Sequence, residues 1–342
     1  DWASLSAGSV MAPFWHHGVA GASRSMTRAP DHPAQRLRYH GRQGCGAARR
    51  FAVEQAPSVR PRIRRRQGEP AMTRERMRLF FAPLLLLMVA PFAAAEPETP
   101  APTVVIVHGA WGGGWDWKET ARALESRGFE VYRPTLTGLG ERRHLLSPDI
   151  DLTTHIADVV NVLRFEQLED VILVGHSYGG MVITGVAEEV PERLEQLVYF
   201  DAFVPFDGEC VLAVGREADP SELCTEKAAA RMLTETTEAG GIPPGWVAPG
   251  TRPPTDVPHP VSTFIEPIQL TGEPGNGVPA GYIITRETAG GPDDFNVTAK
   301  RAEDLGFPVV EYIGNHVPYR ADPEGIARLF VGFGPVAGPA SN

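Results

Sequence analysis

The sequence predicts an α/β protein: a mostly parallel sheet with helices on both faces and an inserted cap. Short runs of β-branched and other apolar residues indicate buried strands, and they alternate with segments of helical length and spacing. This alternation stops at about residue 203 and resumes at about residue 280. Proline and glycine are dense between these points, which indicates an irregular insertion at about 203–279.

The elements expected before the insertion follow one another closely. Strands are predicted at 103–107, 130–133, 171–174 and 196–200. Helices are predicted at 117–127, where Gly128 ends the helix, at 151–165, where Asp151 or Thr153 caps it, and at 181–189. Residues 136–148 are expected to form a polar loop.

Within the insertion only residues 222–238 have a helical pattern. After it, strands are predicted at 282–285 and 309–313, and helices at 293–305 and 323–330. Strands that alternate with helices of this length are typical of a parallel sheet covered on both faces.

The first 95 residues differ in composition from the rest. Residues 1–71 are rich in arginine, glycine and proline and contain no lysine, so we expect a disordered extension upstream of the natural start. Met72 then begins a segment with arginines, an apolar stretch at 79–92 and Ala93-Ala94-Ala95. This pattern predicts an export signal at 72–95, because the apolar stretch is too short for a membrane anchor. The exported domain is then expected at 96–342, in the periplasm or medium.

The exported part is acidic. It holds 17 lysines and arginines against 37 acids, a formal charge of −20. This charge argues against a nucleic-acid partner, and no membrane anchor is expected in the mature form. Its two cysteines, Cys210 and Cys224, are expected to pair in an oxidising compartment, the alternative being two separately buried thiols.

One motif carries the strongest chemical signal. The run Gly175-His176-Ser177-Tyr178-Gly179 follows a buried strand and precedes a helix. A serine at such a sharp turn is held clear of the backbone, and the N–H groups of the next helix point to the space beside its hydroxyl. Ser177 is therefore predicted to be a nucleophile, the alternative being a tight turn without chemistry.

A serine needs a base to accept its proton, and groups that act on a ligand lie past the carboxyl ends of parallel strands. His316 directly follows the last predicted strand, whereas the alternative, His259, lies between prolines in the cap. His316 is therefore the predicted base.

The acid that orients this base is less well determined. Asp201, at the end of the strand 196–200, is preferred. Glu287 is one alternative, and the pair Asp293 and Asp294 is another, although that pair is also suited to cap the helix that it begins.

An oxyanion needs donors that are in place before it forms. The backbone N–H groups of Tyr178 and of Ala110, in the turn after the first strand, are the expected donors.

Trp111 is expected to pack in a wall of the site, and the alternative is a direct contact with the substrate. His108 is expected to stabilise the turn rather than to act as a second base. Arg142, Arg143 and His144 are expected to lie on a solvated loop, and the alternative is that they steer an anionic substrate. No metal or organic cofactor is expected.

Four stretches together resemble the α/β-hydrolase superfamily, and within it a bacterial branch related to plant methylesterases and hydroxynitrile lyases. They are His108-Gly109-Ala110-Trp111, residues 136–143, Gly175-His176-Ser177-Tyr178-Gly179-Gly180 and residues 197–205. The resemblance covers about 103–330. It implies the α/β-hydrolase fold, a triad of serine, histidine and acid, and hydrolysis of small carboxylic esters through an acyl-enzyme.

Differences from this family and its relatives restrict the choice of the acid and the reactions that are expected. The plant members place the acid after the next-to-last strand, where this chain has Arg286-Glu287-Thr288-Ala289, so Asp201, a position used elsewhere in the superfamily, is preferred. The lyases carry a lysine directly after the catalytic histidine, where this chain has Val317, so cyanohydrin cleavage is not expected. Ser177 also excludes the mechanism of epoxide hydrolases and haloalkane dehalogenases, which requires a carboxylate nucleophile.

We therefore expect an exported serine carboxylesterase. A hydrolase-fold protein that binds a small ligand with slow or no turnover is the alternative from another class. An amidase or a lactonase with the same triad is a third possibility.

Overall fold

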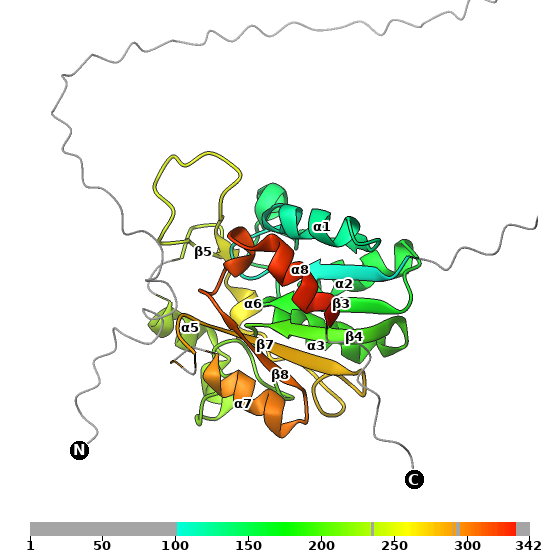
Figure 1. Ribbon diagram of the computed structural model, residues 1–342. Coiled ribbons are helices and arrows are strands. Elements are labelled where there is room, and N and C mark those ends of the chain that lie inside the picture. Colours follow the sequence, from blue (N-terminus) through cyan, green and yellow to red (C-terminus); the bar gives the residue numbers. More distant parts are fainter. Residues whose placement is uncertain (1–100, 234–235, 290, 292–294, 333–342) are drawn as a thin grey trace, which may run out of the picture. The chain divides into compact units, whose positions relative to one another are not determined.

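The computed structural model describes residues 101–233, 236–289, 291 and 295–332. The predicted extension at 1–71, the predicted export signal at 72–95, and Asp293 and Asp294 lie outside these residues. The described part contains a six-stranded sheet in the order β2-β1-β3-β4-β7-β8, and all its strands are parallel (Figure 1). The strands are β1 (Thr103–Val107), β2 (Glu130–Tyr132), β3 (Val171–His176), β4 (Leu194–Phe200), β7 (Ala280–Arg286) and β8 (Val309–Ile313).

Helices cover both faces of this sheet, as the sequence predicts. In β1, Val104 and Ile106 point to one face and Val105 and Val107 to the other, because side chains alternate along a strand. Two helices pack on the first face, α1 (Lys118–Glu125) and α8 (Pro323–Gly332). Three helices pack on the second, α2 (Leu152–Phe165), α3 (Gly179–Glu189) and α7 (Asn296–Asp304). The fully buried strands therefore match their continuous apolar sequences.

A local signal explains where α2 begins. Asp151 caps α2, because its carboxylate accepts the backbone N–H of Thr154 at 2.8 Å. The predicted polar loop at 136–148 contains a short 3₁₀ helix, Gly140–Leu145.

The single helix predicted at 222–238 is wrong. The structure has two short helices there, α4 (Pro220–Leu223) and α5 (Glu226–Met232). Cys224 leaves the helical conformation, with φ −82° and ψ 57°, and the hydroxyl of Thr225 accepts the N–H of Ala228 at 3.1 Å to begin the second helix. The N-cap at Thr225 therefore begins a new helix inside the segment that the sequence pattern predicts as one helix.

The segment predicted as a cap also holds α6 (Ser262–Ile265) and a two-stranded antiparallel sheet of β5 (Gly241–Ile242) and β6 (His259–Pro260). The predicted disulfide between Cys210 and Cys224 is present.

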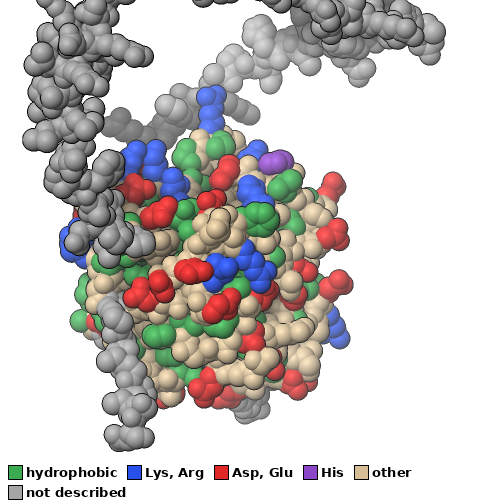
Figure 2. Space-filling model, turned by 90° about the vertical axis from the view of Figure 1, so that its right-hand side faces the viewer, with side chains coloured by type: hydrophobic (Ala, Val, Ile, Leu, Met, Phe, Trp, Pro, Cys, Tyr) green, Lys and Arg blue, Asp and Glu red, His purple; other side chains and the backbone are tan. Residues whose placement is uncertain are grey.

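No helix within the described residues has the length and apolar character needed to cross a membrane. Acidic and basic side chains are interspersed on the face seen in Figure 2, so that face carries no continuous basic patch.

The disulfide closes a short loop, so its removal should increase the conformational freedom of the unfolded chain. We expect the double variant Cys210→Ser/Cys224→Ser to lose about 3 kcal/mol of unfolding free energy, measured by denaturant titration. Reducing agent should lower the stability of the wild-type protein but not that of the variant. Mass spectra of unreduced peptides with both thiols free would contradict the pairing.

Candidate active site

Ser177 lies on a strained turn between β3 and α3. Its φ of 55° is in the left-handed region, which non-glycine residues rarely adopt. Its backbone N–H donates to the carbonyl of Phe200 at 3.2 Å, and its carbonyl accepts the N–H groups of Gly180 and Phe203. A Cβ on Gly179 would lie 2.6 Å from the carbonyl oxygen of Val107, so only glycine lets the helix begin this close to β1. The local sequence therefore produces the sharp turn expected of a nucleophile.

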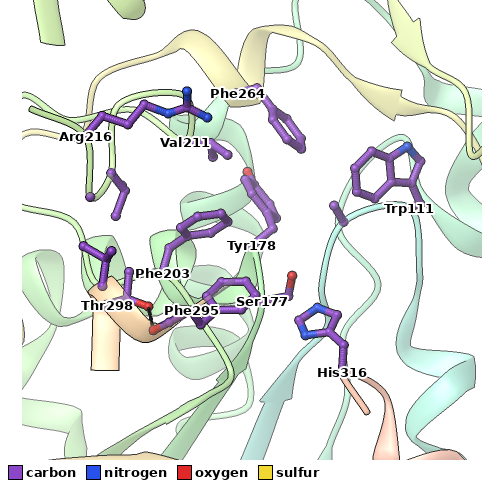
Figure 3. Close-up of a pocket in the computed structure, with 14 residues that line it drawn as sticks. Trp111, Ser177, Tyr178, Phe203, Val211, Arg216, Phe264, Phe295, Thr298 and His316 are labelled. Atoms are coloured by element: carbon purple, nitrogen blue, oxygen red, sulfur yellow. Dashed lines mark hydrogen bonds between the residues drawn. The ribbon is translucent and has the colours of Figure 1, made fainter. Parts of the chain in front are cut away.

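An apolar cavity of ≈ 210 Å³ lies above this turn. Figure 3 shows the hydroxyl of Ser177 and the imidazole of His316 together on one side of the cavity. The other lining residues come from the sheet ends, the cap and α7, and they are Ala110, Trp111, Tyr178, Phe203, Val211, Val214, Gly215, Arg216, Phe264, Phe295, Val297 and Thr298. A mostly apolar pocket with few polar groups is the usual form of a small-molecule site.

Asp201 contacts the predicted base. The Nδ1 atom of His316 lies 2.6 Å from Oδ2 of Asp201, a carboxylate that is fully buried. Thr285, on the neighbouring strand β7, also donates to this carboxylate, from its N–H at 3.0 Å and from its hydroxyl at 2.7 Å. Burial of the carboxylate is therefore compensated by hydrogen bonds. The contact with Asp201 uses Nδ1 of His316, so Nε2 is available to a group in the cavity.

The alternative acid Glu287 is exposed on the segment after β7. The structure therefore brings Asp201, rather than Glu287, against His316. The alternative base His259 is fully buried and does not line the cavity.

The ring of His316 packs between two other rings. Phe295 stacks on it with a centroid distance of 5.2 Å and an interplanar angle of 6°, and His176 lies 4.6 Å away. The Nε2–H of His176 donates to the backbone carbonyl of His316 at 2.9 Å. Burial, and then the neighbouring His316, lower the pKa of His176 well below its usual range. Sequence reasoning missed this role of His176, although its place directly before Ser177 was a signal.

The predicted oxyanion donors both lie at the cavity. Ala110 follows the turn after β1, and a Cβ on Gly109 would lie 3.0 Å from Cβ of Ser177, so the glycine permits this close approach. His108 stabilises the turn, since its Nδ1–H donates to the carbonyl of Gly109 at 2.7 Å and its Nε2 accepts the N–H of Leu136 at 3.1 Å. Burial lowers the pKa of His108. A neutral His108 matches the role expected from the sequence.

Trp111 connects this turn to the cap. Its backbone N–H donates to Nδ1 of His259 at 3.2 Å, and its carbonyl accepts the N–H of Val257 at 2.9 Å. Its indole N–H donates to the carbonyl of Ile242 at 2.8 Å. With a φ of 62°, Trp111 is held in a conformation that these cap contacts help to stabilise.

Tyr178 is also fixed through its side chain. Its hydroxyl donates to Nδ1 of His155 at 2.9 Å, and Nε2–H of His155 donates to the carbonyl of Thr137 at 2.9 Å. Burial lowers the pKa of His155 to about 4 and raises the pKa of Tyr178 well above its usual value. Both groups are therefore neutral near pH 7, and the sequence contained no periodic signal for this pair.

The described residues contain no cluster of three or more histidine, cysteine or acidic side chains that could hold a metal ion.

The buried histidines predict how stability depends on pH. Burial lowers the pKa of His108, His155, His176 and His259, so the unfolded chain binds protons that the folded chain does not. We expect the free energy of unfolding to fall as the pH decreases below about 6.5, by up to about 1.4 kcal/mol per pH unit for each histidine. For His155 this loss continues down to a pH of about 4.

The variant His155→Gln should make this slope shallower, measured by denaturant titration between pH 4 and pH 7. The control His144→Gln replaces an exposed histidine and should leave the slope unchanged. Parallel curves for the wild type and His155→Gln would contradict this account.

Comparisons with known proteins agree with the geometry. The model of the alpha/beta hydrolase family matches residues 104–329. The carbendazim hydrolyzing esterase of Nocardioides sp. (strain SG-4G) is 51% identical over 122 residues, which cover 36% of this chain and 50% of that protein. Salicylic acid-binding protein 2 of Nicotiana tabacum is 33% identical over 124 residues, which cover 34% of this chain and 47% of that protein. The match thus spans about half the length of each of these two relatives.

Among solved structures, an extracellular alpha/beta-hydrolase from a Paenibacillus species superimposes with a TM-score of 0.54 and 26% identity, over 68% of this chain and 99% of that one. The parallel sheet, the turn at Ser177 and the match over 104–329 lead to one conclusion. The chain belongs to the alpha/beta hydrolase family.

Proposed function

We propose that this protein is an exported serine carboxylesterase that hydrolyses small carboxylic esters through an acyl-enzyme. One observation carries the proposal. Ser177 and His316 line the same apolar cavity, and the buried carboxylate of Asp201 lies 2.6 Å from Nδ1 of that histidine. A nucleophile, a base and an orienting acid therefore follow one another from the cavity into the protein interior.

In the proposed mechanism the oxygen of Ser177 attacks the ester carbonyl while Nε2 of His316 accepts the serine proton. Asp201 holds the imidazole in the required tautomer and stabilises the imidazolium that forms. The N–H groups of Ala110 and Tyr178 donate to the oxyanion. His316 then gives the proton to the leaving alcohol, and a water molecule activated by the same histidine releases the acid.

The surroundings of the triad support this chemistry. His176 and His155 are buried and neutral, so neither places a charge beside the developing imidazolium. Trp111 lines the cavity while its indole N–H is held by the cap, and we propose that its ring contacts the substrate. The Nocardioides relative is named as an esterase, which supports ester hydrolysis here.

Export is part of the same proposal. The sequence at 72–95 has the composition of an export signal. The disulfide between Cys210 and Cys224 is a feature of proteins in oxidising compartments. The Paenibacillus hydrolase is described as extracellular, and this likeness supports the same location.

The variant Ser177→Ala should lose nearly all hydrolysis of p-nitrophenyl acetate, by about 10³-fold or more in kcat, because the nucleophile is removed. The control Ser147→Ala changes a serine outside the cavity and should retain activity. A fluorophosphonate probe should label the wild type and not Ser177→Ala. An unlabelled wild type without turnover would favour a ligand-binding protein instead.

The choice between the two candidate acids can be tested with a matched pair. We expect Asp201→Asn to lower kcat by about 10²–10⁴-fold, since the asparagine amide no longer selects the productive tautomer of His316. Glu287→Gln should stay near the wild-type rate. A larger loss in the glutamate variant would contradict the assignment of Asp201.

A further inference from the structure

Among the described residues that line the cavity, Arg216 is the one lysine or arginine. Figure 3 shows it across the cavity from His316, with the guanidinium on the side away from Ser177. It belongs to the segment that the disulfide between Cys210 and Cys224 closes. The side chain is therefore carried by a loop whose ends are held together.

The guanidinium of Arg216 has no hydrogen bond or ion pair within the described part of the chain. The carboxylate of Asp219, three positions further along the chain, accepts the backbone N–H of Ser221 at 2.9 Å. Other partly buried arginines of the domain do have acidic partners: Arg301 lies 2.5 Å from Glu209, and Arg142 lies 3.1 Å from Asp158. Arg216 thus differs from the arginines that support the fold.

A partly buried cation without a counter-ion is unfavourable, because lost hydration is not compensated. Burial accordingly lowers the pKa of Arg216. The apolar side chains that line the cavity with it, among them Val211, Val214 and Phe264, cannot accept its N–H groups. A ligand that brings an anion into the cavity would supply the missing partner.

We propose that Arg216 is a specificity-determining residue that binds a carboxylate of the substrate remote from the scissile ester. A guanidinium binds a carboxylate through two parallel hydrogen bonds, which orients a ligand as well as attracting it. The ester group lies at Ser177 and the free carboxylate at the opposite side of the cavity. This inference rests on the proposed esterase function and adds the substrate class: half-esters with a free acid group.

The surrounding charge makes such a local cation useful. The chain from Glu96 onward carries a formal charge of −20, which repels anionic substrates at long range. A single cation inside an apolar cavity restores a specific attraction at short range, where the lower dielectric strengthens it.

The test compares carboxylate-bearing esters with neutral esters of equal length, by pH-stat titration. Monomethyl adipate against methyl hexanoate places the carboxylate on the acyl side. 6-Acetoxyhexanoate against hexyl acetate places it on the alcohol side. We expect the wild type to favour the charged member of at least one pair by about tenfold or more in kcat/KM. The pair that shows the preference identifies which part of the substrate reaches Arg216.

The variant Arg216→Gln should reduce that preference by about tenfold or more, mainly through a higher KM, and Arg216→Lys should have an intermediate effect. The control Arg164→Gln removes an exposed arginine outside the cavity and should leave the preference unchanged. Equal kcat/KM for the charged and neutral members of both pairs, or a ratio that Arg216→Gln does not change, would overturn the inference.

Calorimetry separates this inference from the esterase proposal. Monomethyl adipate and 6-acetoxyhexanoate, which Ser177→Ala should not cleave, are titrated into that variant and into Ser177→Ala/Arg216→Gln. At least tenfold weaker binding of one of them to the double variant would support the role of Arg216 even if the wild type hydrolysed no ester. Equal affinity of both variants for both probes would overturn the role of Arg216 even in a working esterase.

Discussion

The sharp turn that holds Ser177 between β3 and α3 is the constraint on which the rest of the site depends. The left-handed conformation of this serine is unfavourable by itself, and three backbone hydrogen bonds and the contact of Gly179 with β1 compensate for it. The same turn places Tyr178, whose N–H is a predicted oxyanion donor, at the cavity. The hydroxyl and one predicted oxyanion donor are therefore positioned by a single local structure.

The second predicted donor depends on the cap. Ala110 directly precedes Trp111, whose N–H, carbonyl and indole are all bonded to cap residues. The cap thus does more than cover the cavity, because its docking also fixes the turn after β1.

Polar groups around the cavity follow two patterns. His108, His155, His176 and His259 are buried and neutral, and each has a hydrogen-bond partner, so they shape the site without adding charge. Arg216 is the exception, a cation whose N–H groups are not used by the described part of the fold. The neutral histidines, each with at least one hydrogen bond, support the site, whereas the charge of Arg216 is available to recognise a ligand.

The sequence by itself determined the parallel sheet, its two helical layers, and the positions of Ser177 and His316, because strand ends and the Gly-x-Ser-x-Gly turn are local signals. It did not determine the division of the cap helix at Cys224 or the roles of His155 and Arg216. Only the tertiary structure decided which carboxylate lies against His316, since Asp201 is 115 positions away in the chain. Such pairs depend on the order of strands in the sheet and on loop packing, and neither leaves a periodic trace in the sequence.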